Sequence, residues 1–158
     1  MKRFRIETQV ACPFSAAIDF AKDYFRLRAP GVLRVPLRLG PVDIQFNRTM
    51  TARMIVCTDR TDLTRKHEAL EIRMHPLGAI PFPEFSSTLT VRPHMPPGTL
   101  LALEVSYRPP LGILGSILDA ALGRRVALGI ARALLGDLAS YLAERAREFA
   151  RSGSIDDD

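Results

Sequence analysis

The chain changes its hydrophobic pattern at one short junction, Tyr107-Arg108-Pro109-Pro110-Leu111-Gly112-Ile113-Leu114-Gly115. Before this junction, apolar and polar residues alternate in several runs, which is typical of half-buried β-strands. After it, apolar residues recur every three or four positions, as on one face of an α-helix. Strands followed by one long C-terminal helix predict an α+β fold in which a curved antiparallel sheet wraps around that helix. Such an arrangement can leave a hollow for a ligand between sheet and helix.

The helical stretch carries one continuous stripe of large apolar side chains. It steps by four residues through Leu114, Leu118, Leu122, Val126, Ile130, Leu134, Leu138 and Leu142. We expect this stripe to face the sheet, and we expect Gly123 to separate a short first helix from the main one. Residues 152–158 are rich in aspartate and predict a disordered acidic tail, so that residues 1–151 form a single domain.

The strand-like runs predict a sheet of about six or seven strands. Residues 3–11 alternate and form the first strand, and Pro13 suits the first turn of a short helix that follows it. Pro36 predicts an edge strand or a bulge. The alternating run at 42–56 is long enough to contain a bend or turn, which we place near Asn47. Three further runs follow at 66–75, 85–91 and 101–107.

The composition indicates a globular, mildly basic protein. Its 158 residues are 47% hydrophobic, carry a net charge of +5, and can bury a core without metal or disulfide bonds. The basic residues are spread along the chain, and the apolar runs are broken by Arg and Asp, so we expect neither a nucleic-acid partner nor an integral membrane segment. Cys12 and Cys57 lie far apart and no apolar leader is evident, which predicts a reduced, cytoplasmic protein.

The apolar faces of the strands and the helix are the main candidate site. Either they form a solid core, or part of them lines a cavity. The methionines among them favour an adaptable lining, because Met packs around irregular shapes. The predicted lining residues are Ile44, Phe46, Met50, Met54, Leu70, Ile72, Met74, Phe85, Leu89, Leu103, Val105, Leu134 and Leu138.

Two polar residues share these apolar faces. If 42–56 is one unbroken strand, Arg48 lies on the inward face, where its charge requires an acidic partner on the protein or the ligand. If Asn47-Arg48 forms a turn, Arg48 is solvated instead. Tyr107 either hydrogen-bonds an oxygen of a ligand or is a core tyrosine with a partner in the protein.

Two local patterns carry a resemblance to a known family. One is Pro81-Phe82-Pro83-Glu84-Phe85 followed by Thr88-Leu89, and the other is Gly98-Thr99-Leu100 followed by the junction itself and Asp119. Together with the order of elements, they resemble the START-like, or Bet v 1-like, helix-grip superfamily (SRPBCC), in a bacterial, polyketide cyclase-like branch. The resemblance implies a binding protein for a hydrophobic small molecule such as a lipid, fatty acid, isoprenoid or polyketide, held between sheet and helix. One fold hosts many functions, so the ligand itself is not implied.

Two other functions compete with the binding protein. A polyketide cyclase or aromatase would need an inward acid or base, and the sequence places no His, Asp or Glu there, so we predict no catalytic residue and lean away from an enzyme. The histidines lack metal-ligand spacing and no phosphate loop is present, so no metal or cofactor is predicted. A protein-interaction module is the third possibility, because Gly129, Ala133 and Gly136 form a small-residue helix face that suits a homodimer.

Overall fold

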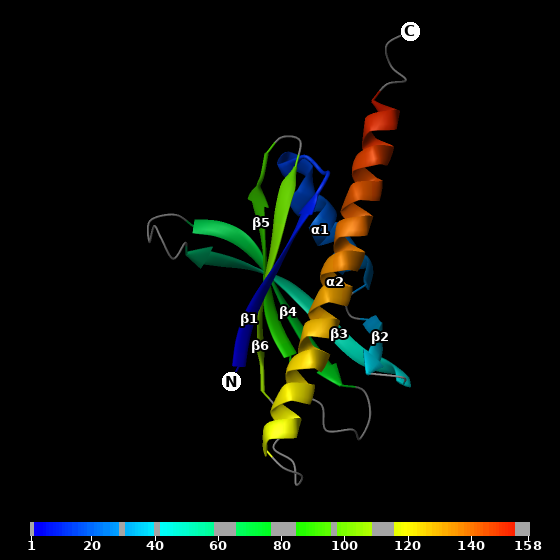
Figure 1. Cartoon of the computed structure of the whole chain (residues 1–158). Helices are drawn as coiled ribbons and strands as arrows, with labels where there is room; N and C mark the ends of the chain where they lie inside the picture. Colours follow the sequence, from blue (N-terminus) through cyan, green and yellow to red (C-terminus); the bar gives the residue numbers. More distant parts are fainter. Residues whose placement is uncertain are drawn as a thin grey trace.

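The structure is a computed structural model that describes residues 2–28, 31–39, 42–58, 66–76, 85–95, 98–108 and 116–153. Within these ranges, only the backbone is described at 31–51, 54, 56–58, 66–68, 76 and 116–122. The elements follow one another as β1 (Lys2–Val10), α1 (Phe14–Arg28), β2 (Gly31–Leu39), β3 (Val42–Thr58), β4 (Lys66–Pro76), β5 (Phe85–Pro93), β6 (Thr99–Tyr107) and α2 (Ser116–Ser152) (Figure 1).

The strands in these ranges form one antiparallel sheet of six, in the order β1-β6-β5-β4-β3-β2. Each strand from β2 to β5 pairs with the next strand along the chain, and β1 completes the sheet by pairing with β6. The predicted α+β fold is confirmed, with the lower of the two expected strand numbers. Pro36 lies in β2, at the edge of the sheet, where a residue without a backbone N–H is tolerated.

The turn predicted near Asn47 is wrong. β3 runs without interruption from Val42 to Thr58, because its first part pairs with β2 and its second part with β4. Around Arg48 the strand has neighbours on both sides, Leu33 on β2 and Pro76 on β4. Two hydrogen-bonded neighbours hold the chain extended more firmly than its local sequence suggests.

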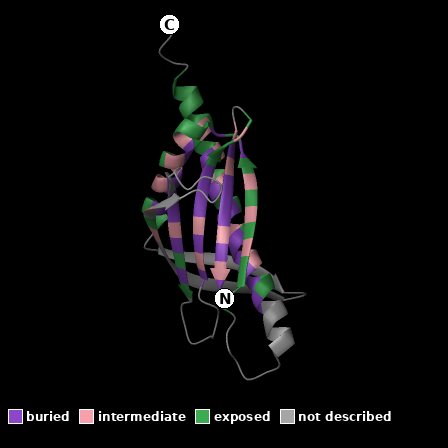
Figure 2. Ribbon diagram, turned by 90° about the vertical axis from the view of Figure 1, so that its left-hand side faces the viewer, coloured by how far each residue is buried: buried purple, intermediate pink, exposed green. Residues whose placement is uncertain are grey.

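The long helix α2 lies against the sheet as the apolar stripe predicts. Val126, Ile130, Leu134, Leu138 and Leu142 are all at most 1% exposed. Figure 1 shows α2 running along the sheet and past its upper end. Figure 2 shows that the C-terminal end of α2 is exposed. The stretch 123–152 has the length and apolar character of a membrane span, yet the buried stripe is what a core helix of a soluble protein requires.

The break predicted at Gly123 is also wrong, because α2 continues through it. A Cβ built on Gly123 would lie 3.9 Å from Cε2 of Tyr107, so this glycine lies where the sheet's tyrosine contacts the helix. One interior glycine costs a helix about 1 kcal/mol, which the packing of a helix this long offsets. The acidic tail was predicted to begin at Ser152, where α2 ends, and residues 154–158 lie outside the described part of the chain.

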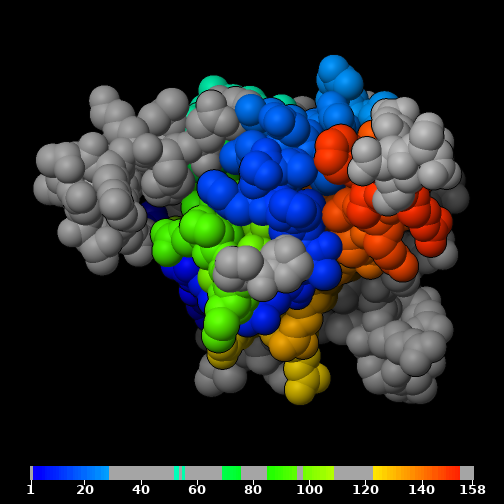
Figure 3. All heavy atoms as spheres, turned by 90° about the horizontal axis from the view of Figure 1, so that it is seen from above, coloured from blue at the N-terminus to red at the C-terminus, as the bar shows by residue number. Residues whose placement is uncertain are grey.

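The short helix α1 joins the sheet to the second half of α2. Its buried face consists of Ala17, Ala21, Tyr24 and Phe25. The hydroxyl of Tyr24 donates a hydrogen bond of 2.6 Å to Oδ2 of Asp137 on α2. The guanidinium of Arg28 stacks over the same ring at 4.2 Å. Figure 3 shows α1 and the C-terminal half of α2 side by side at this end of the molecule.

Candidate functional site

The interior between the sheet and α2 gathers most of the predicted site residues. The predicted residues with described side chains all lie in one cluster, each at most 4% exposed: Leu70, Ile72, Met74, Phe85, Leu89, Leu103, Val105, Tyr107, Leu134 and Leu138. Strand register explains the grouping, because residues on successive strands that pair directly share one face. One such row runs Ile6, Leu103, Leu89, Leu70 from β1 to β4.

The remaining predicted residues lie on β3, where only the backbone is described. The register places Met50 opposite Met74 and Met54 opposite Leu70. Arg48 lies two positions before Met50 in the same unbroken strand. The side chains of Ile44, Phe46, Arg48, Met50 and Met54 lie outside the described part of the structure, so their contact with a ligand stays a prediction.

Tyr107 is the first unusual residue of this interior. Its side chain is 2% exposed, and its hydroxyl has no hydrogen-bond partner among the described residues. The ring packs edge-on against Phe4 at a centroid distance of 6.0 Å. Burial raises the pKa of the Tyr107 hydroxyl, against a smaller opposing effect of Arg124. The hydroxyl is therefore protonated at neutral pH and able to donate a hydrogen bond.

Ser87 is the second unusual residue of this interior. It is 4% exposed, and its Oγ also lacks a hydrogen-bond partner among the described residues. On the sheet it pairs with Val105 on β6 and with Ile72 on β4, both of which belong to the core. Tyr107 lies two residues beyond Val105, which makes it the diagonal neighbour of Ser87 on the same face. An unpartnered buried polar group costs about 1–3 kcal/mol, and two as neighbours in a native core require an explanation.

Comparison with known proteins resolves the fold. No protein-family model matches the chain, and no curated protein is similar to it in sequence. Among solved structures, TTHA0849 from Thermus thermophilus matches with a TM-score of 0.53 at 16% identity, over 92% of this chain and 99% of that one. The chain has the helix-grip fold.

Two further structures show the same likeness. The Zhui aromatase/cyclase from Streptomyces sp. R1128 matches with a TM-score of 0.50 at 14% identity, over 94% of this chain and 95% of that one. The protein XoxI from Bacillus cereus matches with a TM-score of 0.51 at 14% identity, over 95% and 99% of the two chains. The helix-grip fold is thus shared over nearly the whole length of each protein. Sequence identities this low indicate a common fold and nothing about function.

The described part of the helix-grip interior contains no acid–base residue. Its buried polar side chains are hydroxyls, namely Ser87, Thr99 and the two tyrosines, together with the free thiol of Cys12. Thr99 is satisfied, because its hydroxyl donates a 2.6 Å hydrogen bond to the carbonyl of Cys12. Among the described residues, no three His, Cys, Asp or Glu side chains lie close enough to hold a metal ion. This part of the interior can bind and orient, but it offers no group to move a proton at neutral pH.

Ser87 was not among the predicted site residues. It nevertheless lies two positions from both Phe85 and Leu89, which were predicted to face inward. That spacing was the available signal. The small-residue face of α2 was predicted as a dimer contact, and a Cβ built on Gly136 would meet no described atom within 4 Å.

Proposed function

We propose that the protein binds a hydrophobic small molecule between its sheet and α2, with Tyr107 and Ser87 hydrogen-bonded to a polar end of that molecule. The ligand class is a lipid, fatty acid, isoprenoid or polyketide-like compound, and we expect the protein to act in the cytoplasm.

The two unpartnered hydroxyls carry this proposal. Binding sites for apolar ligands combine a mostly apolar lining with a few polar groups that orient the ligand. Tyr107 and Ser87 are such groups, surrounded by Ile72, Met74 and Val105. A ligand oxygen that accepts from both hydroxyls would recover the free energy they lose by burial. The rest of the ligand would gain about 25 cal/mol for each Å² of apolar surface it buries.

Arg48 remains a predicted contact at the same end of the sheet. Because β3 is continuous, Arg48 and Met50 are two positions apart on one strand and share a face of the sheet. Met50 pairs with the buried Met74. A ligand carboxylate would supply the acidic partner that an inward arginine needs. A neutral carbonyl or hydroxyl end would be satisfied by Tyr107 and Ser87 alone.

A cyclase or aromatase activity is the second candidate, supported by the structural likeness to the Zhui aromatase/cyclase. An enzyme that folds a flexible chain into a reactive geometry gains much of its rate from positioning. It also uses a general acid or base, which the described interior does not provide. Binding without chemistry therefore accounts better for these residues.

The test is direct. Native mass spectrometry of the purified protein should reveal a co-purified apolar compound, and a panel of fatty acids and isoprenoids should raise its melting temperature. Removing the Tyr107 hydroxyl should reduce that shift for ligands with a polar end. A protein that carries no compound and shows no thermal shift with any member of the panel would refute the binding function.

A further inference from the structure

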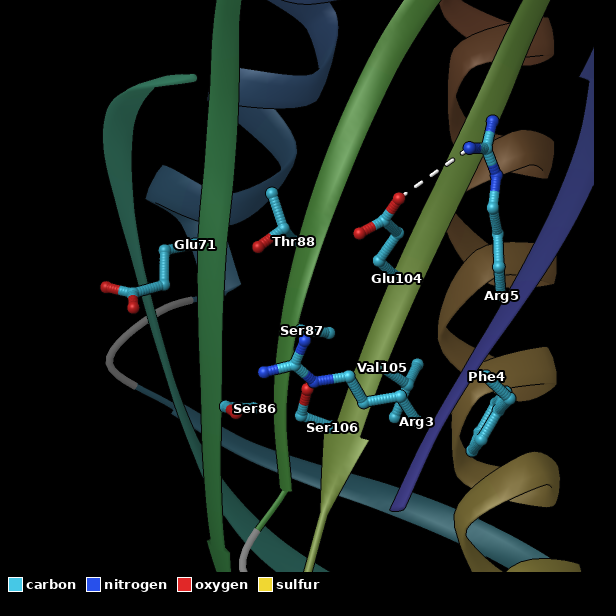
Figure 4. Close-up of a pocket in the computed structure, with 10 residues that line it drawn as sticks. All are labelled: Arg3, Phe4, Arg5, Glu71, Ser86, Ser87, Thr88, Glu104, Val105 and Ser106. Atoms are coloured by element: carbon cyan, nitrogen blue, oxygen red, sulfur yellow. Dashed lines mark ion pairs between the residues drawn. The ribbon is translucent and has the colours of Figure 1, made fainter. Parts of the chain in front are cut away.

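The outer face of the sheet, opposite α2, contains a hollow that is separate from the interior. It has a volume of about 470 Å³ and is lined by residues of four strands, among them Arg3, Arg5, Ser86, Thr88 and Ser106. Figure 4 shows these side chains on the near side of the strands, with α2 behind the sheet. Two smaller hollows, of about 350 and 230 Å³, adjoin it and share Glu71 with it.

Strand register explains why a hollow forms on this face of the sheet. One row of paired residues runs Arg3, Ser106, Ser86, Arg73 from β1 to β4. The two central strands thus contribute short hydroxyl side chains, and the flanking strands contribute long arginines. The serines form a floor, and the longer side chains rise around it. In Figure 4 the side chain of Arg3 extends from β1 across the sheet toward Ser106.

The next row explains the charge of the hollow. It runs Arg5, Glu104, Thr88, Glu71, Arg53 from β1 to β3. Both glutamates are already paired: Glu104 lies 3.6 Å from Arg5, and Glu71 binds Arg53 and, at 3.1 Å, Arg73. These two arginines also hold the pKa of Glu71 below its usual value, so that its charge persists in mild acid.

Two arginines at this face have no such partner. Arg3 and Arg108, which line the main hollow and its neighbour, make no ion pair with a described residue. Across the three adjoining hollows, five arginines face two glutamates. The face therefore has spare positive charge beside a floor of hydroxyl donors.

From this arrangement we infer that the outer face binds a phosphate group carried by a small molecule, with Arg3 and the hydroxyls of Ser106, Ser86 and Thr88 as its contacts. The guanidinium is a planar fork that donates two parallel hydrogen bonds to an oxyanion. The hydroxyls add donors on the remaining sides of a tetrahedral group. A hollow of about 470 Å³ is in the range of small-molecule sites and larger than phosphate alone requires.

Isothermal titration calorimetry tests this inference with inorganic phosphate and glycerol 3-phosphate as probes. We expect both to bind, the ester more tightly, and Arg3→Gln to weaken binding at least tenfold. Ser106→Ala should weaken it about threefold, for loss of one hydrogen bond. The matched control is Arg132→Gln, which removes the same charge from an exposed position on α2 and should leave binding unchanged.

Three results would overturn the inference: neither probe binds, Arg132→Gln weakens binding as much as Arg3→Gln, or acetate binds as tightly as phosphate. Arg3 is exposed, so its replacement should not affect folding. The thermal shift caused by an apolar ligand should be the same in Arg3→Gln as in the original protein. This readout separates a failure of the outer site from a failure of the interior one.

Discussion

Tyr107 and Tyr24 allow a sharp test, because they are alike in burial and opposite in hydrogen bonding. Both are at most 2% exposed. The Tyr24 hydroxyl donates to Asp137 at 2.6 Å, whereas the Tyr107 hydroxyl has no partner among the described residues. Replacing each by phenylalanine removes one oxygen and leaves the ring. The two substitutions should therefore change the free energy of unfolding of the ligand-free protein in opposite directions.

The magnitudes follow from the cost of an unpartnered hydroxyl and the value of a satisfied one. Tyr107→Phe should stabilise the ligand-free protein by about 1 kcal/mol, the low end of the range for relieving an unsatisfied buried group. Tyr24→Phe should destabilise it by about 1–2 kcal/mol, since its bond reaches a carboxylate whose side chain is half exposed. For a chain of this size, 1 kcal/mol corresponds to about 2–4 °C in melting temperature.

The same substitution, Tyr107→Phe, should weaken ligand binding although it stabilises the ligand-free protein. An apolar ligand with an oxygen at one end loses one hydrogen bond in Tyr107→Phe, so its dissociation constant should rise about three- to tenfold. The assays are urea unfolding of protein shown by native mass spectrometry to be empty, followed by titration with the ligand. If Tyr107→Phe destabilises the empty protein, or leaves the dissociation constant unchanged, the hydroxyl has a structural partner and the reasoning about the interior is wrong.

Four further outcomes follow from the described contacts. Leu138→Ala should lower the free energy of unfolding by about 3 kcal/mol in urea titration, because it empties a fully buried position on α2. Gly136→Ala should raise it by up to about 1 kcal/mol in the same titration, because alanine favours the helix and the added Cβ meets no described atom of the chain. Burial and Asp137 raise the pKa of Tyr24, so the stability it contributes should be full below pH ~10 and fall above it; this loss should be absent in Tyr24→Phe. Arginine contacts lower the pKa of Glu71, so its contribution is present above pH ~4.3 and lost as the pH falls; Glu71→Gln and the original protein should therefore converge in stability in acid.

The fold was predictable because two simple periodicities meet at one junction. The alternation of β1, with Phe4 and Ile6 inward, and the four-residue steps of α2 both survive in the structure. The two failures have a common cause. The sequence near Asn47 and at Gly123 weakens a strand and a helix locally, but neighbouring strands and the core hold both elements intact.

The candidate sites were less predictable, because they depend on contacts between distant residues. Tyr24 and Asp137 are separated by 113 positions, and no local pattern joins them. The serine floor of the outer face requires Ser86 and Ser106 to pair across two strands, which depends on sheet register rather than on local sequence. Ser87 could have been predicted from the sequence, because it lies two positions from each of the inward-facing residues Phe85 and Leu89.

The pairing of β1 with β6 has a consequence for biosynthesis. The first strand of the chain has no neighbour until residues 99–107 have left the ribosome, and α2, which covers the sheet, is translated later still. Early in translation, Phe4 and Ile6 therefore present an apolar edge with nothing to cover it. The nascent chain should therefore bind chaperones until residues 99–107 emerge, and the six-stranded sheet should be complete only after that point.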